Sequence, residues 1–131
     1  MNSTYELPPE QDPAMQEAIQ HARRSWPKFE KAFRRRKRGQ VFLVKAAFTG
    51  TSRLDGKARV ERMWFQVSEI NDGMVQGVLD NWPCVLSDVK KGDRVSVRVS
   101  EIWDWTYLKN GYPYGNYTIK VLRQRYGLDR A

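Results

Sequence analysis

The sequence contains very few of the residues from which common catalytic and metal sites are built. Its 131 residues include one cysteine, Cys84, and one histidine, His21. A single cysteine cannot form an internal disulfide, and so few sulfur and imidazole donors argue against a transition-metal site. We recognise no Ser-His-Asp set and no glycine-rich phosphate loop, because the glycines are scattered at turns. We therefore expect neither a metal nor a cofactor.

Long apolar runs are also missing. None approaches the roughly 18 residues that a membrane helix needs, so no membrane insertion is expected. Residues 1–6 lack the basic and then apolar pattern of a signal peptide. Cysteine-poor composition fits a reducing compartment. These features predict a soluble cytoplasmic protein.

Positive charge is abundant and unevenly placed. The formal net charge is +8, from 23 Lys and Arg against 15 Asp and Glu. Residues 13–40 hold nine bases and two acids (+7), residues 1–12 hold three acids and no base (−3), and residues 41–131 hold fourteen bases and ten acids (+4). The excess in one segment favours an acidic partner, which is nucleic acid, an acidic protein face or an anionic membrane surface.

Residues 13–38 have the pattern of a basic helix. Asp12 is suited to cap it, and Pro13 to its first turn. Pro27 predicts a kink, or a restart capped by Ser25, because its ring blocks the preceding turn. Spacings of i, i+3, i+4 and i+7 give one apolar stripe, formed by Met15, Ala18, Ile19 and Ala22.

The end of this helix carries five consecutive cations and has two readings. We expect the helix to end at Gly39, with the cations in a last turn where the macrodipole favours them. Alternatively, the cations bind nucleic acid without regard to sequence and with a steep salt dependence. The residues of this candidate nucleic-acid surface are Arg34, Arg35, Arg36, Lys37 and Arg38, together with Arg23, Arg24, Lys28 and Lys31 earlier in the helix.

From residue 40 the pattern becomes alternating. It predicts a β-meander of about five strands over residues 40–122, at 41–48, 59–67, 74–79, 94–100 and 117–121. Asp72-Gly73 and Asn110-Gly111 are among the dipeptides that favour tight turns between strands. The alternation fails near Ser100, which indicates a bulge or a strand end there.

The order of these elements predicts an α+β fold. The N-terminal helix packs on a strongly curved, mainly antiparallel sheet and covers its apolar face. Residues 13–126 are expected to form a single domain, preceded by a flexible lead-in at 1–12 and followed by a tail at 127–131.

Charged residues inside the predicted strands require an explanation, because an unpaired charge in a sheet is costly. Lys45 and Glu61 lie in adjacent predicted strands, and the simpler interpretation is a cross-strand pair. A sharper one joins Glu61, Asp80 and Asp104 into the acidic site of a small hydrolase. No other catalytic signature supports it, so we predict no catalytic residue.

Aromatic and polar residues gather late in the chain. Asp104 and Trp105 are expected to cap a turn and to fill one end of the core, respectively. The alternative is a protein-binding surface that joins the loop after residue 79 to the aromatic segment 104–117. A base-stacking platform is a further alternative. The candidate protein-binding residues are Asp80, Asn81, Trp82, Asp104, Trp105, Tyr107, Tyr112 and Tyr114.

In this order, several blocks resemble a bacterial family of small YegJ-like proteins, the domain of unknown function 2314. The similarity runs from about Pro13 to Val121. Its blocks are Ala14-Met15, Ala18, Ala22-Arg23, Phe42-Leu43-Val44-Lys45-Ala46, Glu61-Arg62-Met63-Trp64, Gly77-Val78-Leu79-Asp80-Asn81-Trp82-Pro83, Lys91-Gly92-Asp93-Arg94-Val95, Ile102-Trp103-Asp104-Trp105, Gly115 and Thr118. The resemblance implies a fold and candidate positions, not an activity. The polar candidates that it supplies are Lys45, Glu61, Trp64 and Thr118.

Two features depart from the family pattern. The basic run at 34–38 is not part of it, and the export signal of some relatives is not seen.

Our leading hypothesis is a non-enzymatic protein-binding module, in its specific form an immunity-type protein that neutralises a bacterial toxin. Nucleic-acid binding and a small hydrolase using Glu61 and Asp104 are the alternatives.

Overall fold

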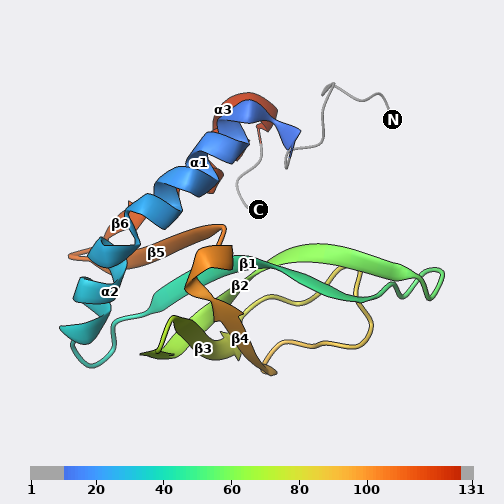
Figure 1. The fold of residues 1–131 in the computed structure, drawn as a ribbon, viewed down its shortest axis with the longest axis horizontal. Coiled ribbons are helices and arrows are strands. Elements are labelled where there is room, and N and C mark those ends of the chain that lie inside the picture. The colour runs from blue at the N-terminus through green and yellow to red at the C-terminus, as the bar shows by residue number, and fades with distance from the viewer. Residues whose placement is uncertain (1–10, 128–131) are drawn as a thin grey trace.

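A computed structural model describes residues 11–127 of the chain. It contains helices α1 (Pro13–Arg24), α2 (Trp26–Arg34) and α3 (Tyr117–Tyr126) and the one-turn 3-10 helix η2 (Val99–Glu101). Its strands are β1 (Phe42–Thr51), β2 (Ala58–Asn71), β3 (Met74–Leu79), β4 (Arg94–Arg98), β5 (Asp104–Lys109) and β6 (Tyr112–Gly115). The chain is therefore α+β, as predicted (Figure 1).

The predicted N-terminal helix is divided in two. Asp12 caps α1, accepting a hydrogen bond at 2.8 Å from the backbone N–H of Ala14. A break at Ser25 separates α1 from α2, in whose first turn Pro27 lies, so the predicted restart is confirmed. The Ser25 hydroxyl does not cap α2 but donates back to the carbonyl of His21. The end at Gly39 was wrong, because α2 stops at Arg34 and most of the basic run lies in the loop beyond it.

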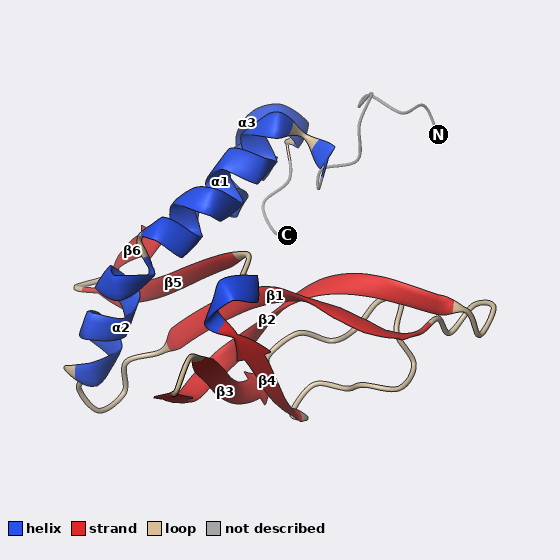
Figure 2. Cartoon of the chain, in the orientation of Figure 1, coloured by secondary structure: helices blue, strands red, loops and turns tan. Residues whose placement is uncertain are grey.

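All strand pairs are antiparallel, in the order β4-β3-β2-β1-β5-β6. The β1–β2 hairpin extends beyond the part of the sheet that the helices contact (Figure 2). Four predicted strands are present, and β4 ends at Arg98, consistent with the strand end expected near Ser100. The predicted turns at residues 72–73 and 110–111 adopt the positive φ of tight hairpins.

The predicted strand at 117–121 was wrong, and two strands, β5 and β6, were missed. Residues 117–121 begin α3, whose Ile119 and Leu122 pack against Met15 and Ile19 of α1. Five residues are too few to separate a strand repeat from a helix repeat, so packing against α1 decides the outcome. The six-stranded sheet replaces the predicted five-stranded meander.

The main core lies between α2 and one face of the sheet. Trp26, Phe29 and Phe33 of α2 are buried there against Phe42 and Trp105. The antiparallel helices α1 and α3 lie side by side (Figure 1) and enclose a second, smaller cluster. Arg125 near the end of α3 pairs with Asp12 before α1 at 2.7 Å. The helices thus gather around β5.

The domain limits stay a prediction. The proposed lead-in at 1–12 and tail at 127–131 fall mostly outside the described residues. Asp12, which was assigned to the lead-in, is only 3 % exposed and belongs to the packed structure.

Candidate functional site

A buried polar network connects the centre of the sheet to α3. The register places Lys45 on β1 opposite Trp64 on β2 and opposite Asp104 on β5, so the three residues share one face. Lys45 Nζ donates to Thr118 Oγ1 at 2.9 Å, and that hydroxyl donates to Asp104 Oδ2 at 2.6 Å. Lys45 Nζ also lies 5.8 Å from the ring centroid of Trp64. Three of the four polar candidates, Lys45, Trp64 and Thr118, therefore lie together.

Asp104 caps α3 from a neighbouring strand. Its carboxylate accepts hydrogen bonds from the backbone N–H groups of Tyr117 at 3.1 Å and Thr118 at 2.8 Å. Asn116, at the N-cap position, makes no side-chain capping bond. A carboxylate at a helix N-terminus accepts hydrogen bonds from N–H groups that have no partner within the helix. Its negative charge also interacts favourably with the positive end of the helix dipole. Asp104 therefore fixes the start of α3 on the sheet.

Burial controls the protonation of this network. It lowers the pKa of Lys45 from 10.5 to about 8, although the nearby Asp104 carboxylate acts in the opposite direction. It also raises the pKa of Asp104, against the hydrogen bonds that this carboxylate accepts. Lys45 is 1 % exposed, and Asp104 and Thr118 are 0 % exposed. A substrate cannot reach groups buried to this extent, so the network is structural.

Glu61 does not join this network. It lies opposite Phe48, three residues along β1 from Lys45 and thus on the other face of the sheet. Its carboxylate accepts backbone N–H bonds from residues 84–86 at 2.7, 2.9 and 3.1 Å. Partial burial alone would raise the pKa of Glu61, but these donors and Arg53 hold it below its ordinary value.

Two predictions about Glu61 are therefore wrong. The Lys45–Glu61 pair does not form, because the actual register places the two side chains on opposite faces. The same separation divides Glu61 from Asp104, so the acidic hydrolase site is not assembled. The strand positions were predicted approximately, but the register decides which side chains meet.

The loop after β3 extends the strand pairing. Asn81 Oδ1 accepts from the Trp64 N–H at 2.6 Å, and the Asp80 N–H donates to the Trp64 carbonyl at 3.0 Å. Trp82 is 73 % exposed, with Lys91 Nζ 5.8 Å from its ring centroid. Of this part of the predicted protein-binding surface, Trp82 presents the largest apolar side chain to solvent.

The aromatic segment divides into buried and accessible residues. Trp105 is 0 % exposed and donates its Nε1–H to the carbonyl of Ala22 at 3.0 Å. Asp104 and Trp105 are therefore removed from the predicted contact surface. Tyr107 is also buried, Tyr114 is half-buried, and Tyr112 is 73 % exposed.

The predicted surface is not continuous. Tyr112 and Tyr114 lie on β6, whereas the loop at 80–83 follows β3, and β2, β1 and β5 stand between these two strands. The two segments are close in the sequence, since both follow residue 79. They are far apart in the sheet, because β5 pairs with β1 on the side opposite to β2.

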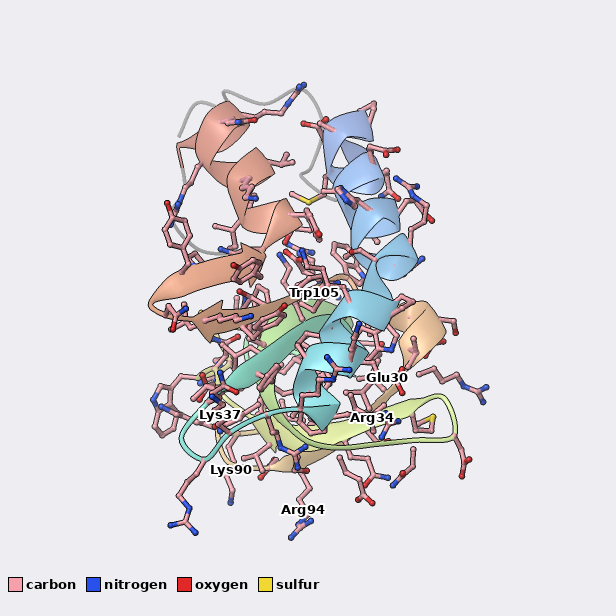
Figure 3. The ribbon with its side chains drawn as sticks, turned by 90° about the vertical axis from the view of Figure 1, so that its left-hand side faces the viewer. Glu30, Arg34, Lys37, Lys90, Arg94 and Trp105 are labelled. Carbon is pink, nitrogen blue, oxygen red and sulfur yellow. The ribbon has the colours of Figure 1, made fainter. Side chains whose placement is uncertain are left out.

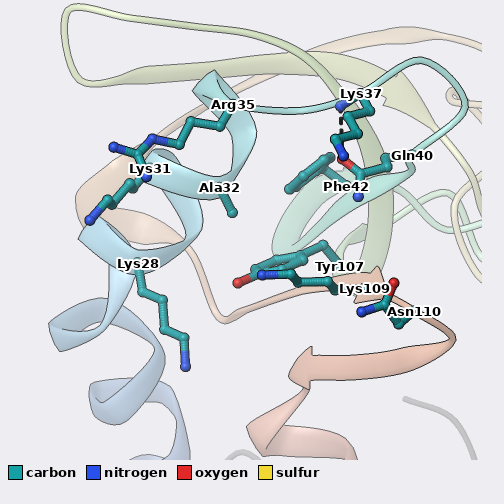
Figure 4. A pocket seen from close by; sticks show the side chains of 10 residues that line it. All are labelled: Lys28, Lys31, Ala32, Arg35, Lys37, Gln40, Phe42, Tyr107, Lys109 and Asn110. Atoms are coloured by element: carbon teal, nitrogen blue, oxygen red, sulfur yellow. Dashed lines mark hydrogen bonds between the residues drawn. The ribbon is translucent and has the colours of Figure 1, made fainter.

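A basic groove lies between α2 and the β1–β5 part of the sheet (Figure 4). It is a hollow of about 430 Å³, the size of a small-ligand site. Phe42 and Tyr107 form its floor, and none of the described residues that line it is Asp or Glu. Its polar and charged lining residues are Lys28, Lys31, Arg35, Lys37, Gln40, Lys109 and Asn110.

The five cations of this lining have no counter-charge among the described residues. Within residues 11–127, Lys31, Arg35, Lys37 and Lys109 form no ion pair. Lys28 Nζ lies 5.2 Å from the ring centroid of Tyr114. Figure 4 shows the cations on the walls of the groove, on α2, on the following loop and on β5.

The other members of the basic run have different roles. Arg34 pairs with Glu30 on α2, and the two are seen together in Figure 3. Arg36 donates to the Phe33 carbonyl at 2.9 Å and lies over the Phe33 ring. Arg38 is exposed beside the groove rather than in its lining. The predicted nucleic-acid surface is thus divided, and its members that line the groove are Lys28, Lys31, Arg35 and Lys37.

The groove combines parts of two sites that were predicted separately. Arg35 and Lys37 come from the basic run, and Tyr107 comes from the aromatic segment. Sequence reasoning missed Lys109, Gln40 and Asn110. The Asn110-Gly111 turn was recognised, but no pattern indicated that it faces α2.

Two further findings concern metals and membranes. Within the described residues, no three His, Cys, Asp or Glu side chains lie close enough to hold a metal ion. None of the helices in this range is long and apolar enough to cross a membrane. The cytoplasmic location expected from the low cysteine content stays a prediction.

Fold and site together define a small α+β protein with a structural polar centre and an open basic groove. The chain belongs to the bacterial family described as "Uncharacterized protein conserved in bacteria (DUF2314)", which it matches over residues 12–130. The resemblance noted from the sequence blocks is thereby confirmed.

Two relatives are informative. The uncharacterized protein YegJ of Escherichia coli K12 is 32 % identical over 118 residues, which cover 90 % of this chain and 72 % of YegJ. A putative ankyrin repeat protein of Neisseria meningitidis serogroup B is 40 % identical over 63 residues, which cover 48 % of this chain and 25 % of that protein. No solved structure matches the chain.

Proposed function

We propose that this protein is a non-enzymatic binding module that takes an acidic segment of a partner protein into the basic groove. One observation carries the proposal. Four cations that form no ion pair within residues 11–127, Lys31, Arg35, Lys37 and Lys109, line a hollow in which the described lining residues include no acid. Cations held close together repel one another, and an anionic ligand removes that repulsion.

The shape and the floor of the groove favour a protein segment over nucleic acid. Single-stranded nucleic acids bind by stacking bases on free aromatic faces. The tyrosine in the floor, Tyr107, already stacks on Tyr114, with ring centroids 5.3 Å apart, and Lys28 lies over Tyr114. The exposed Tyr112 ring stands beside the groove and is not part of this floor. The concave hollow also suits an inserted side chain better than a convex duplex.

The Neisseria relative supports a protein partner. It is named as a putative ankyrin repeat protein, and ankyrin repeats form extended binding surfaces. The specific form of the proposal is an immunity-type protein, in which the groove would bind an acidic face of a bacterial toxin. The net charge of +8 would speed the approach of such a partner.

The test uses a labelled peptide of alternating Glu and Gly in fluorescence-anisotropy titrations. The doubly reversed variant Lys31→Glu/Arg35→Glu should weaken binding at least about tenfold, because two attractive charges become repulsive. Lys90→Glu/Arg94→Glu is the matched control, because it changes the net charge by the same amount and both residues are exposed but lie outside the lining. Equal affinities for the wild type and the double variant would show that the groove does not bind acidic segments.

Nucleic-acid binding is the second candidate. Arg35, Lys37 and Arg38 are exposed and form no ion pair within the described residues, which favours contact with phosphates. A filter-binding titration with a labelled oligonucleotide at low and at moderate salt decides this candidate. Retention at low salt that falls steeply with added salt supports it, and no retention at low salt ends it.

A further inference from the structure

One aromatic residue beside the groove is left uncovered. Lys109 of β5 and Tyr112 of β6 are directly paired, so their side chains leave the same face of the sheet. Lys109 lines the groove, and Tyr112 stands next to it at the edge. The Tyr112 side chain is 73 % exposed.

Tyr112 follows a row of packed rings. The ring centroids of Phe42 and Tyr107 are 5.1 Å apart, and those of Tyr107 and Tyr114 are 5.3 Å apart. Tyr112 lies two residues from Tyr114 in the same strand and so on the same face. Among the described side chains, no ring packs on it.

Pairing of a partner strand with β6 through backbone hydrogen bonds is not favoured at this edge of the sheet. β6 is the last strand of the sheet, and an edge strand can bind an added strand through free N–H groups. Pro113 lies in the middle of β6 and has no N–H to donate. Side chains therefore provide the contacts that this edge offers.

We propose that the acidic segment carries an apolar side chain, which packs on the Tyr112 ring while the neighbouring carboxylates meet Lys109 and the other groove cations. This inference rests on the proposed function and adds the chemical class of the segment: acidic and amphipathic. Tyrosine suits the role, because it supplies a large contact area with few side-chain torsions to fix.

The same hairpin offers a matched control. Leu108 is adjacent to Lys109 in β5 and is 53 % exposed, but it leaves the opposite face of the sheet. Replacing Leu108 removes exposed apolar surface from the same hairpin without touching the groove side. A difference between Tyr112 and Leu108 variants is thus a difference between the two faces.

The experiment compares two labelled peptides by fluorescence anisotropy, the Glu-Gly repeat and the same repeat with one central Phe. Wild type and Leu108→Ala should bind the Phe peptide about tenfold more tightly than the plain one, as expected for burying one aromatic side chain. Tyr112→Ala should bind both peptides equally, at the wild-type affinity for the plain peptide. Tyr112→Phe should keep the advantage of the Phe peptide.

The outcomes separate the two proposals. Plain-peptide binding that needs Lys31 and Arg35, with no preference for the Phe peptide, overturns this inference and leaves the proposed function intact. A preference that survives Tyr112→Ala, or that disappears in Leu108→Ala, also overturns it. If neither peptide binds the wild type, the proposed function fails and the inference fails with it.

Discussion

The two charged regions of this protein differ in whether their charges have partners. At the sheet centre, Lys45, Thr118 and Asp104 form a hydrogen-bonded chain with almost no exposed surface. In the groove, Lys31 and Arg35 face a hollow and form no ion pair within the described residues. The buried region looked like a site in the sequence and holds the fold together, whereas the exposed region is available to a ligand.

The largest expected effect comes from breaking the buried region. Asp104→Asn removes the charge that caps α3 and that lies near the Lys45 ammonium, so the free energy of unfolding should fall by about 3 kcal/mol. Urea denaturation measures the change. Asp80→Asn, at an exposed strand exit, is the control and should stay within about 0.5 kcal/mol of the wild type. Equal decreases in the free energy of unfolding of the two variants would show that Asp104 does not stabilise the fold.

The next effect is a pH dependence that belongs to Lys45. Its pKa is about 8 in the folded protein and 10.5 as the ordinary value, so between these pH values the unfolded chain binds more protons. Stability from this group therefore rises as the pH increases from about 8 to about 10.5.

The variant Lys45→Met tests this, because it keeps a similar volume without the charge. Urea denaturation across this pH range should show the wild type gaining stability relative to the variant. Parallel pH curves for the two proteins would show that the Lys45 ammonium is not held in a desolvated site.

A smaller effect is expected at Glu61, where a charge is only partly buried. Glu61→Gln weakens the hydrogen bonds to residues 84–86, and we expect a loss of about 1 kcal/mol. Because the folded-state pKa is lowered, this contribution is present above the unfolded pKa and is lost as the pH falls through the folded one. Hydrogen exchange at residues 84–86 should accelerate in the variant. Unchanged exchange would show that the Glu61 carboxylate does not protect these N–H groups.

The smallest effect on stability is expected in the groove. Lys31→Gln/Arg35→Gln removes two cations that repel their neighbours and form no ion pair within the described residues. The free energy of unfolding should therefore change by less than about 0.5 kcal/mol, or increase slightly. Urea denaturation of this variant beside Asp104→Asn gives the contrast directly. A loss above about 1 kcal/mol would mean that the groove cations are structural too.

Local patterns predicted the elements better than they predicted the contacts. The apolar stripe of α1, its Asp12 cap and the restart at Ser25 depend on neighbouring residues, and all are present. The α3 segment was predicted as a strand, because the carboxylate that caps this helix, Asp104, lies on β5 and not next to it in the sequence. A cap supplied from a distant strand leaves no local signal in the sequence.

The candidate site was predicted only in part, for a related reason. The basic run and the aromatic segment were both noticed, but neither shows that β5 returns beside β1 and faces α2. That return brings Lys109 to the groove and separates Tyr112 from Trp82. Strand order is set by long-range packing, whereas composition and periodicity report on short windows.

The central claim is that the basic groove is where this protein meets an acidic segment. Amide chemical-shift mapping with the Glu-Gly repeat bearing one Phe tests the location directly. The account predicts the largest shifts at Lys31, Arg35, Gln40, Lys109 and Tyr112, and little change at residues 80–93. Shifts concentrated around Trp82, or spread evenly over every exposed cation, would contradict it.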